Sequence, residues 1–159
     1  MLQDILFTFL WSFSPFGESR VGIPYGIQQG LDIKIVFIVG LFANLLVFPV
    51  LYRVITISNK YLLKNKLYKR LVLFLESRAK TKTKHVIQKY GIWGLMIFVM
   101  IPLPVTGAYI GTIAAFVYRI NYKKAFLAIS SGITISCLLV VFLWPYITKI
   151  VWPYILSFL

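Results

Sequence analysis

The chain has 159 residues, of which 60% are hydrophobic and 13% are charged. Soluble domains carry about 25% charged residues, so this composition is typical of a protein surrounded by lipid. The formal net charge is +13, with a single cysteine and a single histidine, which excludes an internal disulfide and a metal site built from cysteines. Because the chain lacks a recognisable nucleic-acid-binding motif, we expect its positive charge to meet anionic lipid headgroups and not nucleic acid.

The first apolar stretch, residues 2–13, is too short to cross a bilayer, because a transmembrane helix needs about 20 residues. It forms either a helix that reaches half-way or a tilted crossing that the following residues complete. The next segment, residues 14–30, is interrupted by Pro15, Pro24 and several glycines, which break a helix. We therefore predict that the chain turns back here in a re-entrant hairpin. In a bilayer, such irregular backbone must be buried in protein or line a water-filled cavity.

A long apolar segment, Asp32 to Ser58, is the first predicted full crossing of the membrane. Residues 59–90 then form a basic segment, since residues 60–89 hold ten of the seventeen Lys and Arg side chains. Apolar residues recur at helical spacing over residues 60–78, which predicts an amphipathic helix at the membrane surface. The concentration of positive charge predicts that this segment is cytoplasmic.

A second broken segment, residues 91–119, contains Pro102 and Pro104 at its centre. The two prolines predict a second re-entrant hairpin, for the same reason as in the first. A group of basic residues at positions 119–124 follows, and we expect it to lie on the same side of the membrane as the basic segment. The second predicted full crossing is Ala125 to Trp144.

These elements predict an all-α integral membrane protein with a single membrane domain over residues 1–159. Its two units, residues 13–58 and 91–144, each consist of a re-entrant broken hairpin followed by a transmembrane helix. If residues 59–90 are cytoplasmic, the units have opposite orientations, which is the inverted-repeat plan of many secondary transporters. Short apolar helices flank the units at both ends, and the C-terminal one, residues 145–159, is either a short helix or a partial span. We expect the protein to lie in the plasma membrane.

The sequence lacks the motifs of common enzyme classes, including the P-loop, the nucleophile elbow and the zinc-binding helix motif. Its one histidine, His85, lies in a lysine-rich segment without acidic neighbours. We therefore expect that the protein is not an enzyme and that it needs neither a cofactor nor a metal.

Glu18 and Arg20 are candidate functional residues, because they are charged and lie in a segment that we place at mid-depth in the membrane. An unpaired carboxylate at that depth costs about 2–4 kcal/mol. Either Glu18 forms a proton or ligand site, with Arg20 as its partner or as an anion-binding group, or the two charges hold the hairpin together. Asn44, in the middle of the first crossing, is expected to form a hydrogen bond between helices, with substrate contact as the alternative.

The chain resembles the small multidrug export protein family over roughly residues 15–135. Three features carry the resemblance: Glu18-Ser19-Arg20-x-x-Ile23-Pro24-Tyr25-Gly26, Asn44 with Pro49 in the next helix, and Pro102-Leu103-Pro104-Val105-Thr106-Gly107-Ala108-Tyr109-x-Gly111. That family is in turn similar to the DedA-type membrane proteins, which have two re-entrant hairpins facing each other. The resemblance implies that Glu18 is the protonatable group of the first hairpin.

Together, these interpretations predict a small polytopic transporter, coupled to an ion, for an amphiphilic, cationic or lipid-like substrate. The predicted binding residues lie where the first hairpin meets the second, and they are Glu18, Arg20, Asn44, Pro102, Pro104, Thr106 and Gly107. Two alternatives stay open: a DedA-type flippase or scramblase of lipids or polyprenyl phosphates, and a scaffold that binds anionic lipids without transport. The sequence also leaves open whether the protein forms a homo-oligomer.

Overall fold

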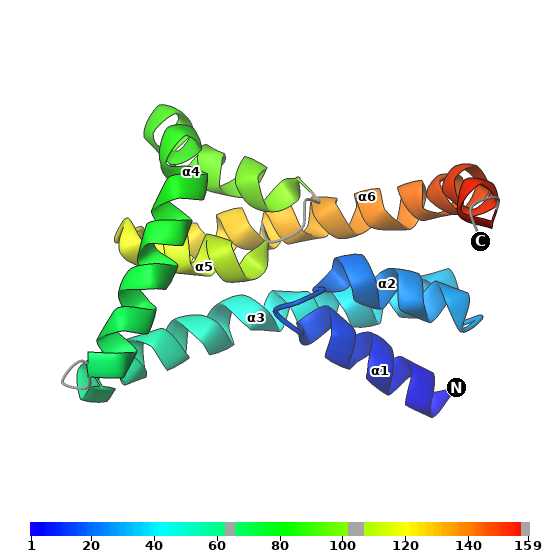
Figure 1. The fold of residues 1–159 in the computed structure, drawn as a ribbon, viewed down its shortest axis with the longest axis horizontal. Coiled ribbons are helices and arrows are strands. Elements are labelled where there is room, and N and C mark those ends of the chain that lie inside the picture. The colour runs from blue at the N-terminus through cyan, green and yellow to red at the C-terminus, as the bar shows by residue number, and fades with distance from the viewer. Residues whose placement is uncertain (63–65, 102–106, 157–159) are drawn as a thin grey trace.

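The structure, a computed structural model, describes residues 1–62, 66–101 and 107–156. Its helices, in chain order, are α1 (Leu2–Phe13), α2 (Ser19–Gln28), α3 (Ile33–Leu62), α4 (Lys66–Met100), α5 (Ala108–Val117) and α6 (Tyr122–Leu156) (Figure 1). No strand occurs in these described ranges, so the prediction of an all-α fold is confirmed.

Helices α3 and α6 each contain an apolar stretch long enough to cross a bilayer, Ile33–Ser58 with 26 residues and Tyr122–Tyr146 with 25 residues. Only 33% of the most apolar part of α3 and 39% of that of α6 is buried inside the protein. Large apolar side chains point outward instead, and Ile38, Phe42 and Phe142 are 64%, 58% and 68% exposed. An apolar surface of this extent is unfavourable in water and favourable in hydrocarbon. The fold therefore agrees with both predicted crossings.

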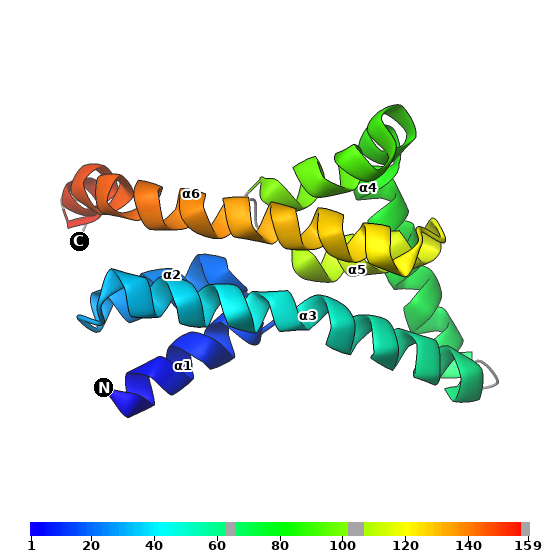
Figure 2. The same ribbon diagram turned by 180° about the vertical axis from the view of Figure 1, so that it is seen from behind.

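The chain forms two pairs of short helices, α1 with α2 and the end of α4 with α5, and the start of α2 meets the start of α5 near the centre of the molecule (Figures 1 and 2). We call these pairs the first and second hairpin. In the first hairpin, α1 packs beside α2, and residues 14–18 join them. In the second, the end of α4 packs beside α5. The long helices α3 and α6 contact each other and run in opposite directions alongside the hairpins.

Close packing within the first hairpin depends on Gly22, in the middle of α2. A Cβ atom at this position would lie 2.0 Å from Ser12 Oγ and 2.7 Å from both Ser12 N and Thr8 O. The backbones of α1 and α2 approach this closely only because glycine has no side chain. The sequence interpretation treated residues 2–13 as a separate short helix, whereas this contact makes α1 the first arm of the first hairpin.

The second arms of the two hairpins, α2 and α5, have ten residues each and begin with the same backbone conformation. Glu18 precedes α2 with φ 54° and ψ −160°, and Gly107 precedes α5 with φ 106° and ψ −157°. This region of backbone space is almost confined to glycine, and another residue held there costs of order 1–3 kcal/mol. Glu18 is therefore held in a strained conformation that its counterpart Gly107 adopts freely.

The same two helices also end alike. Gly30 follows α2 with φ 77°, and Arg119 follows α5 with φ 51°. Left-handed residues at this place form a Schellman motif, in which the next backbone N–H reaches back into the helix. The N–H of Leu31 donates to the carbonyl oxygen of Gly26 (3.1 Å), and that of Ile120 donates to the carbonyl oxygen of Ala115 (2.9 Å).

The long helices α3 and α6 begin with equivalent caps. The side chain of Asp32 accepts a hydrogen bond of 2.8 Å from the backbone N–H of Lys34, and the side chain of Asn121 accepts one of 3.0 Å from the N–H of Lys123. Such caps satisfy N–H groups that have no partner within the helix. The two halves of the chain thus share a local backbone plan that their side chains do not reveal.

The basic helix α4 differs in extent from the amphipathic helix that we predicted over residues 60–78. Helix α3 continues to Leu62, and α4 runs from Lys66 into the second hairpin, with a kink at Gly91 (φ 56°, ψ −126°). From Lys66 to Tyr90 the sequence has no proline and no glycine, so no helix-breaking residue interrupts α4 before Gly91. The basic segment therefore leads directly into the first arm of the second hairpin, across the kink at Gly91.

The sequence analysis placed the start of the C-terminal segment at residue 145 and left this segment open between a short helix and a partial span. Helix α6 continues through Pro145 and ends at Leu156. Figures 1 and 2 show that it bends near this end instead of stopping. A proline inside a helix removes one hydrogen bond and kinks the axis, and it does not always end the helix.

Candidate functional site

Glu18 lies at the start of α2 and is buried, with 6% of its surface exposed. Its Oε1 accepts a long hydrogen bond of 3.4 Å from the backbone N–H of Tyr109. Gly107 leaves the space that the carboxylate fills, because a Cβ atom there would lie 2.0 Å from Glu18 Oε2. The first N–H groups of a helix lack partners within it and carry a partial positive charge. Glu18 therefore caps α5, a helix of the other hairpin.

Arg20 binds the C-terminal end of α4, the other helix of the second hairpin. Its Nη2 donates a hydrogen bond of 3.1 Å to the carbonyl oxygen of Ile101 and a marginal one of 3.5 Å to that of Val99. These carbonyls lie at the C-terminal end of α4, where the last carbonyl groups carry a partial negative charge. The negative Glu18 thus binds the positive start of α5, and the positive Arg20 binds the negative end of α4.

Tyr109 joins the two hairpins a second time, and the sequence analysis did not single it out as a site residue. While its backbone N–H donates to Glu18, its hydroxyl donates a short hydrogen bond to the carbonyl oxygen of Phe13, the last residue of α1. The available signal was its place in the motif that ends at Gly111. One residue of α5 therefore contacts both the start of α2 and the end of α1.

Asn44 forms the interhelical hydrogen bond that the sequence predicted. Its Nδ2 donates to Ser19 Oγ at 2.9 Å, and Asn44 and Ser19 are 2% and 1% exposed. The bond joins the middle of α3 to the first residue of α2, directly after Glu18. The other amide atom of Asn44, Oδ1, is buried and accepts no hydrogen bond from the part of the chain that the structure describes. A buried acceptor in this state is available to a proton donor such as water or a bound molecule.

The structure brings Glu18 and Gly107 of the predicted site residues into direct contact. Arg20 binds the nearby end of α4, and Asn44 bonds to Ser19, the residue between Glu18 and Arg20. The remaining predicted site residues lie outside the described residues: Pro102, Pro104 and Thr106.

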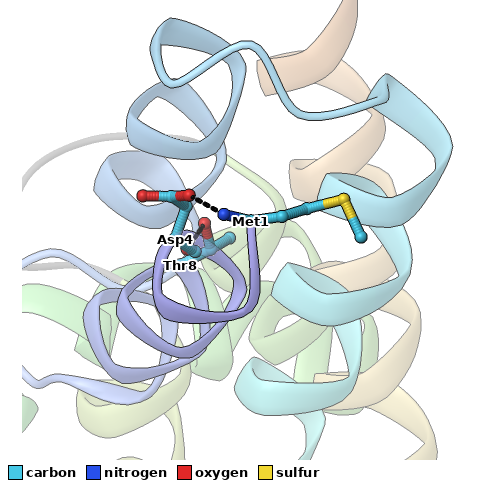
Figure 3. A network of polar contacts seen from close by, with 3 residues as sticks. All are labelled: Met1, Asp4 and Thr8. Carbon is cyan, nitrogen blue, oxygen red and sulfur yellow. Dashed lines mark hydrogen bonds and ion pairs between the residues drawn. The ribbon is translucent and has the colours of Figure 1, made fainter.

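The acidic residues other than Glu18 have different roles where the structure describes their side chains. Asp4 lies at the far end of α1, where its carboxylate is 2.7 Å from the terminal ammonium of Met1, and Thr8 donates to its backbone carbonyl (Figure 3). Asp32 caps the start of α3. Glu18 is therefore the buried acid among the acidic side chains that are described.

Two facing hairpins are joined by a buried glutamate and a partly buried arginine and are flanked by two lipid-compatible helices. This arrangement defines a small helical membrane protein with a polar centre. The chain belongs to the small multidrug export protein family, because residues 18–139 match the family model described as "Putative small multi-drug export protein". The match begins at Glu18 and ends within α6, so it includes the second arm of the first hairpin and the whole second hairpin.

No curated protein and no solved structure matched the chain.

Proposed function

We propose that the protein is an ion-coupled transporter of an amphiphilic or lipid-like substrate in the plasma membrane, with Glu18 as the group that binds the coupling proton. The family description names multidrug export, which supports a transport role. The position of Glu18 is the observation that carries the proposal, since it combines burial, a strained backbone and contact with the opposite hairpin. Ionisable residues inside membranes mark proton and substrate pathways, and backbone strain concentrates at functional sites.

The helix end that Glu18 caps suggests how a proton changes the structure. The N-terminus of α5 stabilises the ionised carboxylate, so the charged form favours contact between the two hairpins. Protonation removes the negative charge and weakens this contact, which favours separation of the hairpins. A ligand shifts a conformational equilibrium only if it binds the two states differently, and a proton on Glu18 meets this condition.

The lengths of the hairpin arms support a re-entrant arrangement, which is part of the proposal. Helices α1, α2 and α5 have 12, 10 and 10 residues, and helices of this length extend about 15–18 Å. The hydrocarbon core is about 30 Å thick, so such arms reach roughly half-way. In this proposal the meeting ends of α2 and α5 lie near mid-depth, and the antiparallel directions of α3 and α6 support opposite orientations of the two units. Two facing re-entrant hairpins are also the arrangement expected if the chain is distantly related to the DedA-type proteins.

The test is proton-dependent flux in liposomes that contain the purified protein, with the lipophilic cation ethidium as the transported probe. We expect the wild type to transport ethidium at a rate that depends on the pH gradient, and Glu18→Gln to lose this dependence while remaining folded. Asp4→Asn, which removes an acid at the far end of α1, is the matched control and should behave like the wild type. Unchanged pH-dependent flux in a folded Glu18→Gln protein would remove Glu18 from the mechanism.

A scaffold without transport activity is the second candidate, because Glu18 and Arg20 each bind a helix end as structural residues do. Thermal unfolding in detergent separates this candidate from the first. If Glu18→Gln and Arg20→Gln each lower the unfolding temperature by several degrees and the losses add in the double variant, the two charges act as independent structural contacts with the two helix ends. A fluorescent phospholipid in the same liposomes tests the flippase alternative.

A further inference from the structure

The turn between α5 and α6 contains an arginine in a backbone conformation that suits glycine. Arg119 has φ 51°, and the equivalent turn between α2 and α3 has Gly30 with φ 77°. Both turns form the same backbone hydrogen bonds. Glycine adopts the backbone conformation of this turn without strain, whereas an arginine in the same conformation is strained. The turn gives no reason for an arginine at this position, so the surroundings of its side chain are of interest.

Arg119 lines a pocket of about 620 Å³ where α3, α5 and α6 meet. The other lining residues combine aromatic rings with hydrogen-bonding groups, and they are Tyr52, Phe116, Val117, Ile120, Asn121 and Tyr122. The rings form a connected cluster, with centroids 5.9 Å apart between Tyr52 and Phe116 and 5.1 Å apart between Tyr52 and Tyr122. None of the lining residues is acidic.

We propose that this pocket binds the phosphate group of an anionic phospholipid. The guanidinium of Arg119 offers the planar set of donors that matches phosphate oxygens. The hydroxyls of Tyr52 and Tyr122 and the amide of Asn121 supply further donors around it. The aromatic rings provide an apolar wall for the first carbons of the lipid's acyl chains, which a free phosphate ion lacks.

The position of the pocket fits a headgroup. Tyr122 is the first residue of the apolar stretch that crosses the membrane, so the pocket opens at its end. Tyrosine is enriched at this level of the bilayer. Lys123 and Lys124 are exposed beside the pocket, and the basic helix α4 crosses the same end of the molecule (Figures 1 and 2). These charges attract anionic lipids to the surface, and the proposal does not depend on the transport function.

The test uses the full-length protein, delipidated in a neutral detergent, with thermal unfolding as the readout. Phosphatidylglycerol, phosphatidylcholine and inorganic phosphate are titrated separately. We expect phosphatidylglycerol to raise the unfolding temperature in a saturable manner, and the other two to have little effect. For Arg119→Gly we expect a higher unfolding temperature without lipid, because the strain is gone, and an apparent affinity for phosphatidylglycerol about tenfold weaker, as the loss of one charged hydrogen bond would give.

Lys34→Gln is the matched control. Lys34 lies at the start of α3, at the opposite end of the molecule, as Lys123 lies at the start of α6. The variant removes one positive charge, as Arg119→Gly does, but leaves the pocket unchanged. It should bind phosphatidylglycerol like the wild type. An unchanged affinity in Arg119→Gly, or an equal loss in Lys34→Gln, would overturn the proposal, because binding would then follow net charge alone. An equal effect of phosphatidylcholine would overturn it as well. Stabilisation by inorganic phosphate to the same extent would assign the pocket to a free anion and overturn the lipid assignment.

Discussion

The contact between Glu18 and Gly107 joins the two hairpins at the scale of single residues. Glycine serves two purposes at position 107, because the backbone there has φ 106° and because Glu18 Oε2 occupies the place of a side chain. Glu18 itself has φ 54°, so both partners lie in backbone regions that cost other residues free energy. The backbone strain at Glu18 persists only because the surrounding contacts offset it.

Gly107→Ala should therefore destabilise the protein by about 2–4 kcal/mol, from backbone strain together with steric overlap at the carboxylate. Gly91→Ala is the matched control, since Gly91 also has positive φ, at 56°, but has nothing within 4 Å of its missing Cβ. This variant should be destabilised only by the backbone strain, about 1–2 kcal/mol. Unfolding in detergent measures both, and equal losses would contradict a close contact between Gly107 and Glu18.

Many residues of this site can be predicted from the sequence, but the groups to which they form hydrogen bonds cannot. Glu18 and Arg20 are conspicuous because charge is rare in apolar segments, and a buried amide such as Asn44 needs a hydrogen-bond partner. Arg20, however, binds backbone carbonyl groups of Val99 and Ile101. Every residue has such a carbonyl, so no residue type marks the two that are used. Only the tertiary arrangement of the hairpins selects them.

At the scale of helices, the first hairpin depends on the contact of Gly22 with α1. In an open helix, replacing glycine by alanine stabilises by about 1 kcal/mol. Here a Cβ atom would lie 2.7 Å from the backbone nitrogen of Ser12, and backbone atoms cannot move aside as the end of a side chain can. We therefore expect Gly22→Ala to have the opposite effect and to destabilise the folded protein by about 1–3 kcal/mol. Unfolding in detergent measures the change, and a rise in stability would show that α1 and α2 are farther apart than described.

Element boundaries follow from sequence where local chemistry sets them. The predicted crossing from Asp32 begins one residue before α3, because Asp32 is a helix cap. Pro145 does not mark a helix boundary, because α6 continues through it to Leu156. The pairing of α1 with α2 was missed. It rests on contacts between residues of different helices, which the apolar pattern of residues 2–13 does not encode.

At the scale of the whole molecule, charge is distributed unevenly between the two ends. The first part of α4 crosses the end where α5 turns into α6, while the turn between α2 and α3 lies at the opposite end (Figures 1 and 2). The α4 end carries most of the Lys and Arg residues of the chain. A basic helix that lies across the ends of transmembrane helices is suited to the surface of the bilayer, and an excess of positive charge marks the cytoplasmic side.

We therefore predict that Lys84 and Lys123 face the cytoplasm and that Gln29, in the turn between α2 and α3, faces the opposite side. All three are exposed. Single cysteines at these positions, in a Cys137→Ser background, should react with a membrane-impermeant maleimide accordingly: the first two only after the membrane is opened, and Gln29→Cys in intact cells. The background protein itself is the control and should not react. Labelling of positions 84 and 123 from opposite sides would mean that the second hairpin crosses the membrane, and the two units could not then be re-entrant and inverted.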